Sequence, residues 1–342
     1  MKKIIIRADG NAKIGAGHLM RCLTVAENID ENRVLFICAD EESAKLAMDH
    51  GFQGFVLNTD YRDMMSELPL WQQMKEQNVG GLGTGEVTIL VDSYYVNNEY
   101  LLALKCMGKV VILDDMAQDV KAADSIINYN AFAYPEMYEG LSGAVDTIIY
   151  TGSTYIPIRP DFVARDYTVA EKVRKVLITT GGGDRDNIAG QILDTIYESG
   201  IFYQVVTGRF NPHYKTLQKY AESHPGVEIL HDVKDMAGLM LGCDLAITAG
   251  GTTVYELCSI GVPFICFSYA ENQEKLVEYV GREKIALSAG KYHWDAAKCL
   301  SEIRNGFERL RGDFLLRKEC SEKEKRIVDG QGAKRIARIL EN

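Results

Sequence analysis

The sequence predicts an α/β protein made of two doubly wound, Rossmann-like domains, each a parallel sheet with helices on both faces. Short apolar, β-branched runs alternate with helical patterns along almost the whole chain, as in parallel sheets buried on both sides. The chain is 342 residues long, more than one core comfortably holds. A proline-containing break at 155–162 separates two such blocks of alternating pattern.

The expected strands follow the apolar runs in order. In the first block they are 3–6, 34–38, 87–92, 110–113 and 125–127, and in the second 175–180, 202–207, 227–230, 245–248, 263–268 and 285–287. We place the domains at residues 1–157 and 158–342. The glycine-rich stretch 80–85 is expected to be a flexible surface loop. The charged helical pattern from Phe314 onward is expected to pack on the outside of the second domain.

Composition and charge restrict the class of protein. The chain is 46% hydrophobic and 25% charged, which is typical of globular proteins, and its formal net charge is -10. This balance argues against nucleic-acid binding and against stable association with an anionic membrane, since both need a basic face. It leaves room for an anionic small molecule held by helix dipoles and backbone amides.

The eight cysteines form no C-x-x-C pair and no metal-like cluster, and several lie inside apolar runs. This usage favours a reducing, cytoplasmic environment. The apolar run that follows Met1 is too short for the core of a signal peptide, and no run approaches the length of a membrane span. We therefore expect neither targeting segment nor membrane anchor.

The first candidate site is the turn that carries Gly15, Gly17 and His18, between the first expected strand and a helical pattern. Glycines let a ligand approach the backbone, and the amide groups of a helix start point into such a turn. Histidine exchanges protons near neutral pH. The turn therefore suits a catalytic base beside an anionic ligand. Two alternatives compete: a dinucleotide fingerprint, which fails because Met20 stands at its third glycine, and a structural histidine.

Two further strand–turn–helix junctions lie in the second half. The glycine run around Gly182 precedes Asp184 and Asp186, which at a helix start act more often as caps than as metal ligands. We therefore expect no metal there.

The second of these junctions carries Gly250, Gly251, Thr252 and Thr253, whose amides and hydroxyls suit a diphosphate. Glu256, about one turn into the following helix, suits the hydroxyls of a ribose. A solvent-facing glutamate is the alternative. A third polar turn follows at 268–274, where Asn272 and Gln273 form another candidate ligand edge. Three such junctions in two similar domains predict a ligand cleft between the domains.

These motifs resemble one known family. The order Arg-x-Asp-x4-Ile-Gly-x-Gly-His-x-x-Arg-Cys-Leu, Gly-Gly-x-Asp and Gly-Gly-Thr-Thr-x-x-Glu is similar to that of the UDP-2,4-diacetamido-2,4,6-trideoxy-β-L-altropyranose hydrolases of pseudaminic acid biosynthesis. The second half also resembles the nucleotide domain of the glycosyltransferase that makes lipid II. The N-terminal motif is the specific part, because the nucleotide-domain motif is shared by many UDP-sugar enzymes.

The resemblance implies a glycosyltransferase-B fold that binds UDP through its C-terminal domain. It implies hydrolysis of a UDP-linked diacetamido sugar by water attack at the anomeric carbon with inversion, without cofactor or metal. His18 would activate the water. The substrate-binding residues that the resemblance and the motifs together imply are Gly15, Gly17, Asp92, Tyr94, Asn130, Arg159, Gly182, Gly250, Gly251, Thr252, Thr253, Glu256, Asn272 and Gln273.

Two other functions fit the same sequence. One is a glycosyltransferase of the same fold that transfers the sugar to an acceptor other than water. The other is a non-catalytic protein that binds a nucleotide sugar. The sequence leaves the identity of the diacetamido sugar and the oligomeric state open.

Overall fold

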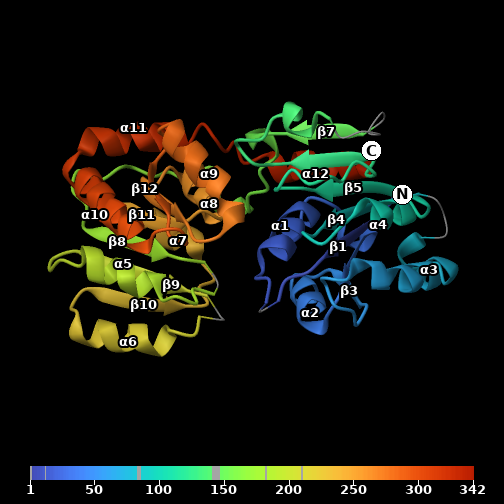
Figure 1. Cartoon of the computed structure of the whole chain (residues 1–342), viewed down its shortest axis with the longest axis horizontal. Helices are drawn as coiled ribbons and strands as arrows, with labels where there is room; N and C mark the ends of the chain where they lie inside the picture. The colour runs from blue at the N-terminus through green and yellow to red at the C-terminus, as the bar shows by residue number, and fades with distance from the viewer. Residues whose placement is uncertain (1, 12, 83–85, 141–146, 182, 209–210) are drawn as a thin grey trace. The chain divides into compact units, whose positions relative to one another are not determined.

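The computed structural model describes residues 2–11, 13–82, 86–140, 147–181, 183–208 and 211–342. The chain divides into two compact units (Figure 1). The first comprises 1–157 together with 331–342, and the second comprises 158–330. No helix in the described part of the chain is long and apolar enough to cross a membrane.

The first unit is built on a parallel sheet with the order β3-β2-β1-β4-β5-β6-β7. Its strands are β1 Lys3–Ala8, β2 Val34–Cys38, β3 Gln53–Val56, β4 Val87–Asp92, β5 Lys109–Leu113, β6 Ser125–Asn128 and β7 Ile148–Thr151. Its helices are α1 Gly17–Ala26, α2 Glu41–Asp49, α3 Leu68–Glu76, α4 Asn98–Lys105 and α12 Gly332–Glu341. Apolar residues of α1, α2 and α12 form one core with the sheet, and those of α3 and α4 form another. The unit is therefore doubly wound.

The second unit repeats this topology with the order β10-β9-β8-β11-β12-β13, again parallel throughout. Its strands are β8 Lys175–Thr179, β9 Phe202–Thr207, β10 Val227–His231, β11 Leu245–Ala249, β12 Phe264–Ser268 and β13 Leu287–Lys291. Its helices are α5 Ile188–Ile196, α6 Tyr214–Ser223, α7 Met236–Leu241, α8 Thr253–Ile260, α9 Glu271–Arg282, α10 Ala296–Gly312 and α11 Phe314–Glu324.

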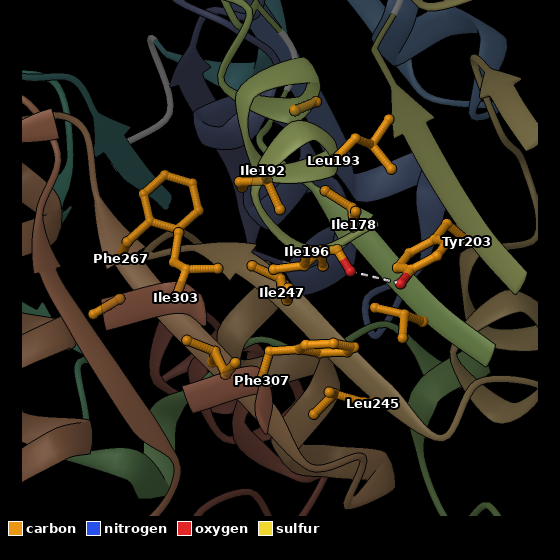
Figure 2. Close-up of a cluster of buried hydrophobic side chains, with 14 of the residues drawn as sticks. Ile178, Ile192, Leu193, Ile196, Tyr203, Leu245, Ile247, Phe267, Ile303 and Phe307 are labelled. Atoms are coloured by element: carbon orange, nitrogen blue, oxygen red, sulfur yellow. Dashed lines mark hydrogen bonds between the residues drawn. The ribbon is translucent and has the colours of Figure 1, made fainter. Parts of the chain in front are cut away.

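Figure 2 shows one core of the second unit, where α5 and α10 pack on the same face of the sheet. Ile192 and Ile196 of α5 and Phe307 of α10 are fully or almost fully buried with Ile247 of β11. The hydroxyl of Tyr203 donates to the carbonyl oxygen of Ile196 at 2.8 Å, so this large polar side chain is buried with its hydrogen bond satisfied.

The strand order explains where ligand-binding turns gather. In both units the order reverses between two central strands, β1 and β4 in the first and β8 and β11 in the second. Connections leave such a pair in opposite directions, which opens a crevice beyond the carboxyl ends of the strands. The turns after β1 and β4 therefore meet, and so do the turns after β8 and β11.

Three edge strands depart from the sequence prediction. β3 and β7 were not expected at all, and β13 lies two residues later than the predicted start at 285. All three are outermost or next to the edge of their sheets and carry partly exposed residues, as in Gln53–Val56. A strand with one solvated face lacks the continuous apolar run by which buried parallel strands are recognised.

The end of the chain also departs from the expectation. Residues 331–342 were assigned to the second domain, whereas α12 packs in the first unit. Its residues Ala333, Ile336, Ala337 and Leu340 are buried in the same core as α1. The helical pattern predicted this helix but not the sheet that receives it, because the pattern of one segment does not specify its partner in the fold.

The described part of the glycine-rich stretch 80–85, residues 80–82, departs from the predicted flexible surface loop. Residues 83–85 lie outside the described residues. Gly80 adopts φ +59°, and a Cβ atom there would lie 2.9 Å from Leu35 Cδ2 and 3.3 Å from Ile5 Cδ1. Leu82 is buried. The first part of this stretch is therefore packed against β1 and β2, and the positive φ with close side-chain neighbours favours glycine at position 80.

Candidate active site

The turn between β1 and α1 has open space around its glycines. Gly15 has φ +78°, and a Cβ atom at Gly15 or Gly17 would meet no atom within 4 Å. The N-cap of α1, Ala16, makes no side-chain capping bond, and the first turn carries no acidic residue. The amide groups of this helix start therefore have no side-chain cap, which suits an anionic or polar ligand.

His18 is held in one orientation by Asp92. The Nδ1 atom of His18 lies 2.6 Å from Asp92 Oδ1, and both side chains are buried. Nδ1 also lies 2.8 Å from Arg21 Nη2, which can only donate, so its two neighbours favour opposite tautomers of the ring. In the tautomer that Asp92 favours, Nδ1 carries the proton and donates to the carboxylate. The Nε2 atom then carries the lone pair. The ring of Tyr94 meets the imidazole edge-on with 4.4 Å between centroids, which fixes the ring from a second side. In that tautomer Nε2 can accept a proton.

The carboxylate of Asp92 is paired twice over. Arg21 Nε donates to Oδ2 and Nη2 to Oδ1, each at 2.5 Å. Burial alone would raise the pKa of Asp92, but the charges and hydrogen bonds of Arg21 and His18 outweigh it and hold that pKa well below its usual range. The sequence motifs predict that Asp92 binds substrate. In the structure both of its oxygens are engaged by protein groups, which makes it a residue that orients His18.

Arg21 extends this network to a residue that the sequence analysis missed. Its Nη1 donates to Asp115 Oδ2 at 2.7 Å and to the Tyr129 hydroxyl at 2.5 Å. The Tyr94 hydroxyl donates to the same Asp115 oxygen at 3.2 Å. Asn130 donates to the carbonyl oxygen of Asp115 at 3.0 Å. Asp115 follows β5 at the same sheet edge as Asp92, and its position two residues after an apolar strand was the signal available in the sequence.

A cavity of about 210 Å³ lies over this network in the first unit. Its wall is formed by Asp9, Lys13, Ile14, His18, Tyr61, Asp92, Ser93, Tyr94 and Tyr95. Of these, His18, Asp92 and Tyr94 were expected at the site. Lys13, Tyr61, Ser93 and Tyr95 were not, because they come from loops whose course the sequence does not determine.

Asp9 is fixed in the cavity wall by a buried ion-pair network. Arg7 is fully buried; its Nη1 donates to Asp9 Oδ2 at 2.5 Å, and its Nε donates to Glu67 Oε2 at 2.9 Å. The amide of Ala39 donates to Asp9 Oδ1 at 2.6 Å. Burial raises the pKa of Asp9, and Arg7 opposes that shift. The Arg-x-Asp motif therefore places a rigid carboxyl group on the wall that His18 also lines.

The second unit carries the other glycine turn, between β11 and α8. A Cβ atom at Gly250 would lie 2.5 Å from Val277 Cγ2, whereas one at Gly251 would meet nothing within 4 Å. Thr252, the N-cap of α8, is exposed and makes no side-chain capping bond; Thr253 begins the helix. Gly250 thus allows α9 to pack closely against the turn after β11, while Gly251 leaves room at an open helix start.

Glu256 and Arg159, both expected at the site, contact each other. Arg159 Nη2 donates to Glu256 Oε1 at 2.9 Å, and the guanidinium lies over the Phe162 ring with its carbon 4.7 Å from the centroid. Burial raises the pKa of Glu256 and the Arg159 charge opposes the shift. The arginine therefore holds the carboxylate in place about one turn from the open start of α8.

The remaining expected residues lie around the other turns of this sheet edge. Asp184 caps α5, because its Oδ1 accepts from the amide of Ile188 at 2.7 Å and its Oδ2 from that of Ala189 at 3.0 Å. Gly182 lies outside the described residues. Gln273 is turned back, with its Oε1 accepting from the amide of Tyr269 at 3.0 Å, and Asn272 is exposed in the first turn of α9. Across the described ranges no group of three or more His, Cys, Asp or Glu side chains could hold a metal.

Comparison with known proteins adds sequence relatives. No protein-family model matches the chain. It is 25% identical over 349 aligned residues to the spore coat polysaccharide biosynthesis protein SpsG of Bacillus subtilis, covering 98% of this chain and 97% of the relative. It is 26% identical over 285 residues to a UDP-2,4-diacetamido-2,4,6-trideoxy-β-L-altropyranose hydrolase of Campylobacter jejuni, covering 82% and 97%. The similarity expected from the motifs is therefore confirmed.

Solved structures establish the fold. MurG of Acinetobacter baumannii superimposes with a TM-score of 0.70 at 15% identity, covering 99% of both chains. A complex of S. aureus MnaA with UDP gives 0.66 at 13% identity, covering 98% of this chain and 95% of the other. The prediction of two doubly wound domains in a glycosyltransferase-B fold is confirmed.

Proposed function

We propose that this chain, which has the glycosyltransferase-B fold and is similar in sequence to a UDP-diacetamido-sugar hydrolase, hydrolyses a UDP-linked 2,4-diacetamido-2,4,6-trideoxy sugar. The products are UDP and the free sugar, and the altropyranose of pseudaminic acid biosynthesis is the sugar proposed. The observation that carries the proposal is the 2.6 Å contact between His18 Nδ1 and Asp92 Oδ1 in the wall of a cavity. A histidine oriented in this way at a cavity wall fits a role in water activation better than a role in core packing.

In the proposed reaction a water oxygen attacks the anomeric carbon while the bond from that carbon to the diphosphate oxygen breaks. The water proton passes to His18 Nε2, and UDP leaves with the bonding electrons. Asp92 stabilises the imidazolium that forms, since its carboxylate stays ionised beside Arg21. A general base in this position contributes roughly 10²–10⁴-fold to the rate. Attack opposite the leaving group inverts the anomeric configuration.

The proposal assigns the nucleotide to the second unit. The open start of α8 at Gly251 suits the diphosphate, and its amides would stabilise the charge that develops on the leaving group. Glu256, oriented by Arg159, would accept from the ribose hydroxyls. Because UDP is a stable anion, the reaction as written needs no metal and no cofactor.

One alternative is supported by a specific observation. The similar structures include a rhamnosyltransferase, SpnG, at a TM-score of 0.64, so the same fold serves transfer to an acceptor other than water. A non-catalytic nucleotide-sugar-binding protein is a second alternative. The three are separated by incubating the pure protein with UDP-diacetamido sugar alone. Release of UDP without an acceptor favours the hydrolase, and tight binding without any product favours the binding protein.

The central test is His18→Ala. We expect this variant to bind UDP as the wild type does, because the nucleotide is assigned to the other unit, and to lose turnover by the factor given above for a general base. His50→Ala is the matched control, since His50 is a partly exposed histidine of the same unit. NMR of the first product formed reports the anomeric configuration. Turnover by His18→Ala near the wild-type rate would show that His18 is not the base.

A further inference from the structure

Three of the nine residues that line the cavity of the first unit are tyrosines. Tyr61, Tyr94 and Tyr95 all line it, together with the apolar Ile14. Tyr94 is already engaged, with its ring against His18 and its hydroxyl donating to Asp115. Tyr61 and Tyr95 instead contact each other, so their part in the cavity differs from that of Tyr94.

Tyr61 and Tyr95 form a pair that joins two loops. Their rings meet edge-on, with centroids 5.7 Å apart and an interplanar angle of 70°. Tyr61 follows β3 and Tyr95 follows β4, and Tyr95 keeps 45% of its surface exposed. An edge-to-face pair fixes both rings while leaving ring surface available to a ligand.

The loop that carries Tyr61 is itself restrained. Arg62 pairs with Asp60 at 2.6 Å, and its guanidinium carbon lies 5.8 Å from the centre of the Tyr61 ring. Each of these contacts is weak at an exposed position. Together with the Tyr61–Tyr95 contact, they hold an aromatic wall beside the cavity without burying it.

The polar residues of the same cavity are Asp9, Lys13, His18, Asp92 and Ser93. The site therefore offers both an apolar surface and a set of polar groups, and a ligand that fills it should match both. The sugar of the proposed substrate does so. Its name specifies two acetamido groups and a deoxygenated C6, hence three methyl groups, and leaves a hydroxyl at C3. An ordinary hexose carries hydroxyl groups at those positions and would present them to the tyrosine rings.

We infer that Tyr61 and Tyr95 form a specificity wall that receives methyl groups of an N-acetylated, deoxygenated sugar. This inference rests on the proposed function for the identity of the sugar. The physical basis is the burial of methyl groups against aromatic rings, for which a single methylene in an apolar pocket discriminates roughly 10–200-fold. The wall would act on substrate binding, whereas His18 acts on the chemical step.

The test compares Tyr61→Ala and Tyr95→Ala with Tyr61→Phe and Tyr95→Phe, which keep the rings. Tyr134→Ala is the matched control, because Tyr134 is a 55%-exposed tyrosine of the same unit outside the cavity wall. The probe is the UDP-linked 2,4-diacetamido-2,4,6-trideoxy sugar. Two quantities are measured: KM with kcat from UDP release, and the saturation that the acetyl methyl protons receive from the aromatic protons of the protein by NMR.

We expect each alanine variant to raise KM about tenfold with kcat changed little, and to weaken the methyl saturation, while both phenylalanine variants and Tyr134→Ala behave as wild type. Unchanged KM and unchanged methyl saturation in both alanine variants, or no methyl saturation in the wild type, would overturn the inference. Tyrosine-dependent methyl saturation without any UDP release would instead uphold the wall and refute the hydrolase. The two proposals therefore fail separately.

Discussion

At the scale of single residues, the site shows how a buried charge network specifies a proton position. His18 alone could be a packing residue. Its Nδ1 contacts Asp92, which Arg21 keeps ionised, and this carboxylate favours the tautomer in which Nε2 is basic. Asp92 lies 74 positions from His18 in the sequence, whereas Arg21 lies three positions away in the same motif. The chemistry of this histidine therefore depends on a network that joins the N-terminal motif to a distant strand.

The first prediction concerns Asp92→Asn. The amide can donate to His18 and so stabilise the wrong tautomer, and it leaves Arg21 without its carboxylate. We expect kcat to fall by about 10²–10⁴-fold while KM changes little, since the carboxylate positions the base rather than the substrate. Steady-state UDP release gives both constants. Asp119→Asn, at a side chain with 56% exposure, should leave them unchanged.

The same variant carries a pH signature. Because the folded-state pKa of Asp92 lies below its unfolded value of about 3.9, its stabilising contribution is complete above that pH and is lost as the pH falls. Asp92→Asn removes this contribution. Urea unfolding should therefore show a smaller loss of stability between about pH 5 and pH 3 in the variant than in the wild type. An equal acid sensitivity in both proteins would contradict the assignment of Asp92 as an ionised, paired group.

At the scale of elements, the two glycines after β11 have different functions. Gly250 lets α9 come close to the turn after β11. A Cβ atom at this position would collide with Val277, a residue of α9. Gly251 faces open space at the start of α8. The sequence shows a single Gly-Gly pair, and only the packing of α9 distinguishes its members.

The second prediction follows from that difference. We expect Gly250→Ala to destabilise the protein by ~1–3 kcal/mol, since the added methyl group overpacks a close contact. Gly251→Ala should keep its stability and weaken UDP binding, because the methyl group occupies the space assigned to the diphosphate. Chemical denaturation and titration with UDP measure the two effects. The assignment fails if Gly251→Ala binds UDP as tightly as the wild type.

At the scale of the whole molecule, the chain returns to its first unit at the end. Residues 331–342 complete the core beside α1, so that neither 1–157 nor 158–342 is a complete structural unit. Arg33 pairs with Glu341 at 2.6 Å on the same surface. Truncation before α12 would therefore expose the apolar face of the unit that carries His18.

The third prediction tests this packing. Ile336 is fully buried in the core of the first unit, and Ile336→Ala should destabilise that unit by ~2–5 kcal/mol. Lys334→Ala, on the exposed side of the same helix, should be nearly neutral. Hydrogen exchange resolved by peptide should place the loss of protection in β1, β4 and α1. Loss confined to β8–β13 would mean that α12 stabilises the second unit instead.

The sequence by itself determined the fold class, the buried strands and the strand–turn–helix junctions that carry His18, Gly250 and Glu256. Those features are local: an apolar run followed by glycines and a helical period has few structural solutions. Tertiary structure decided the rest. The topology of the sheets brought Asp92 and Asp115 close to His18. The packing of α9 gave Gly250 a role different from that of Gly251. Apolar contacts placed α12 in the core of the first unit. Each of these features depends on contacts between segments far apart in the chain. The residues adjacent in sequence do not specify those neighbours, and the neighbours determine how stable each arrangement is.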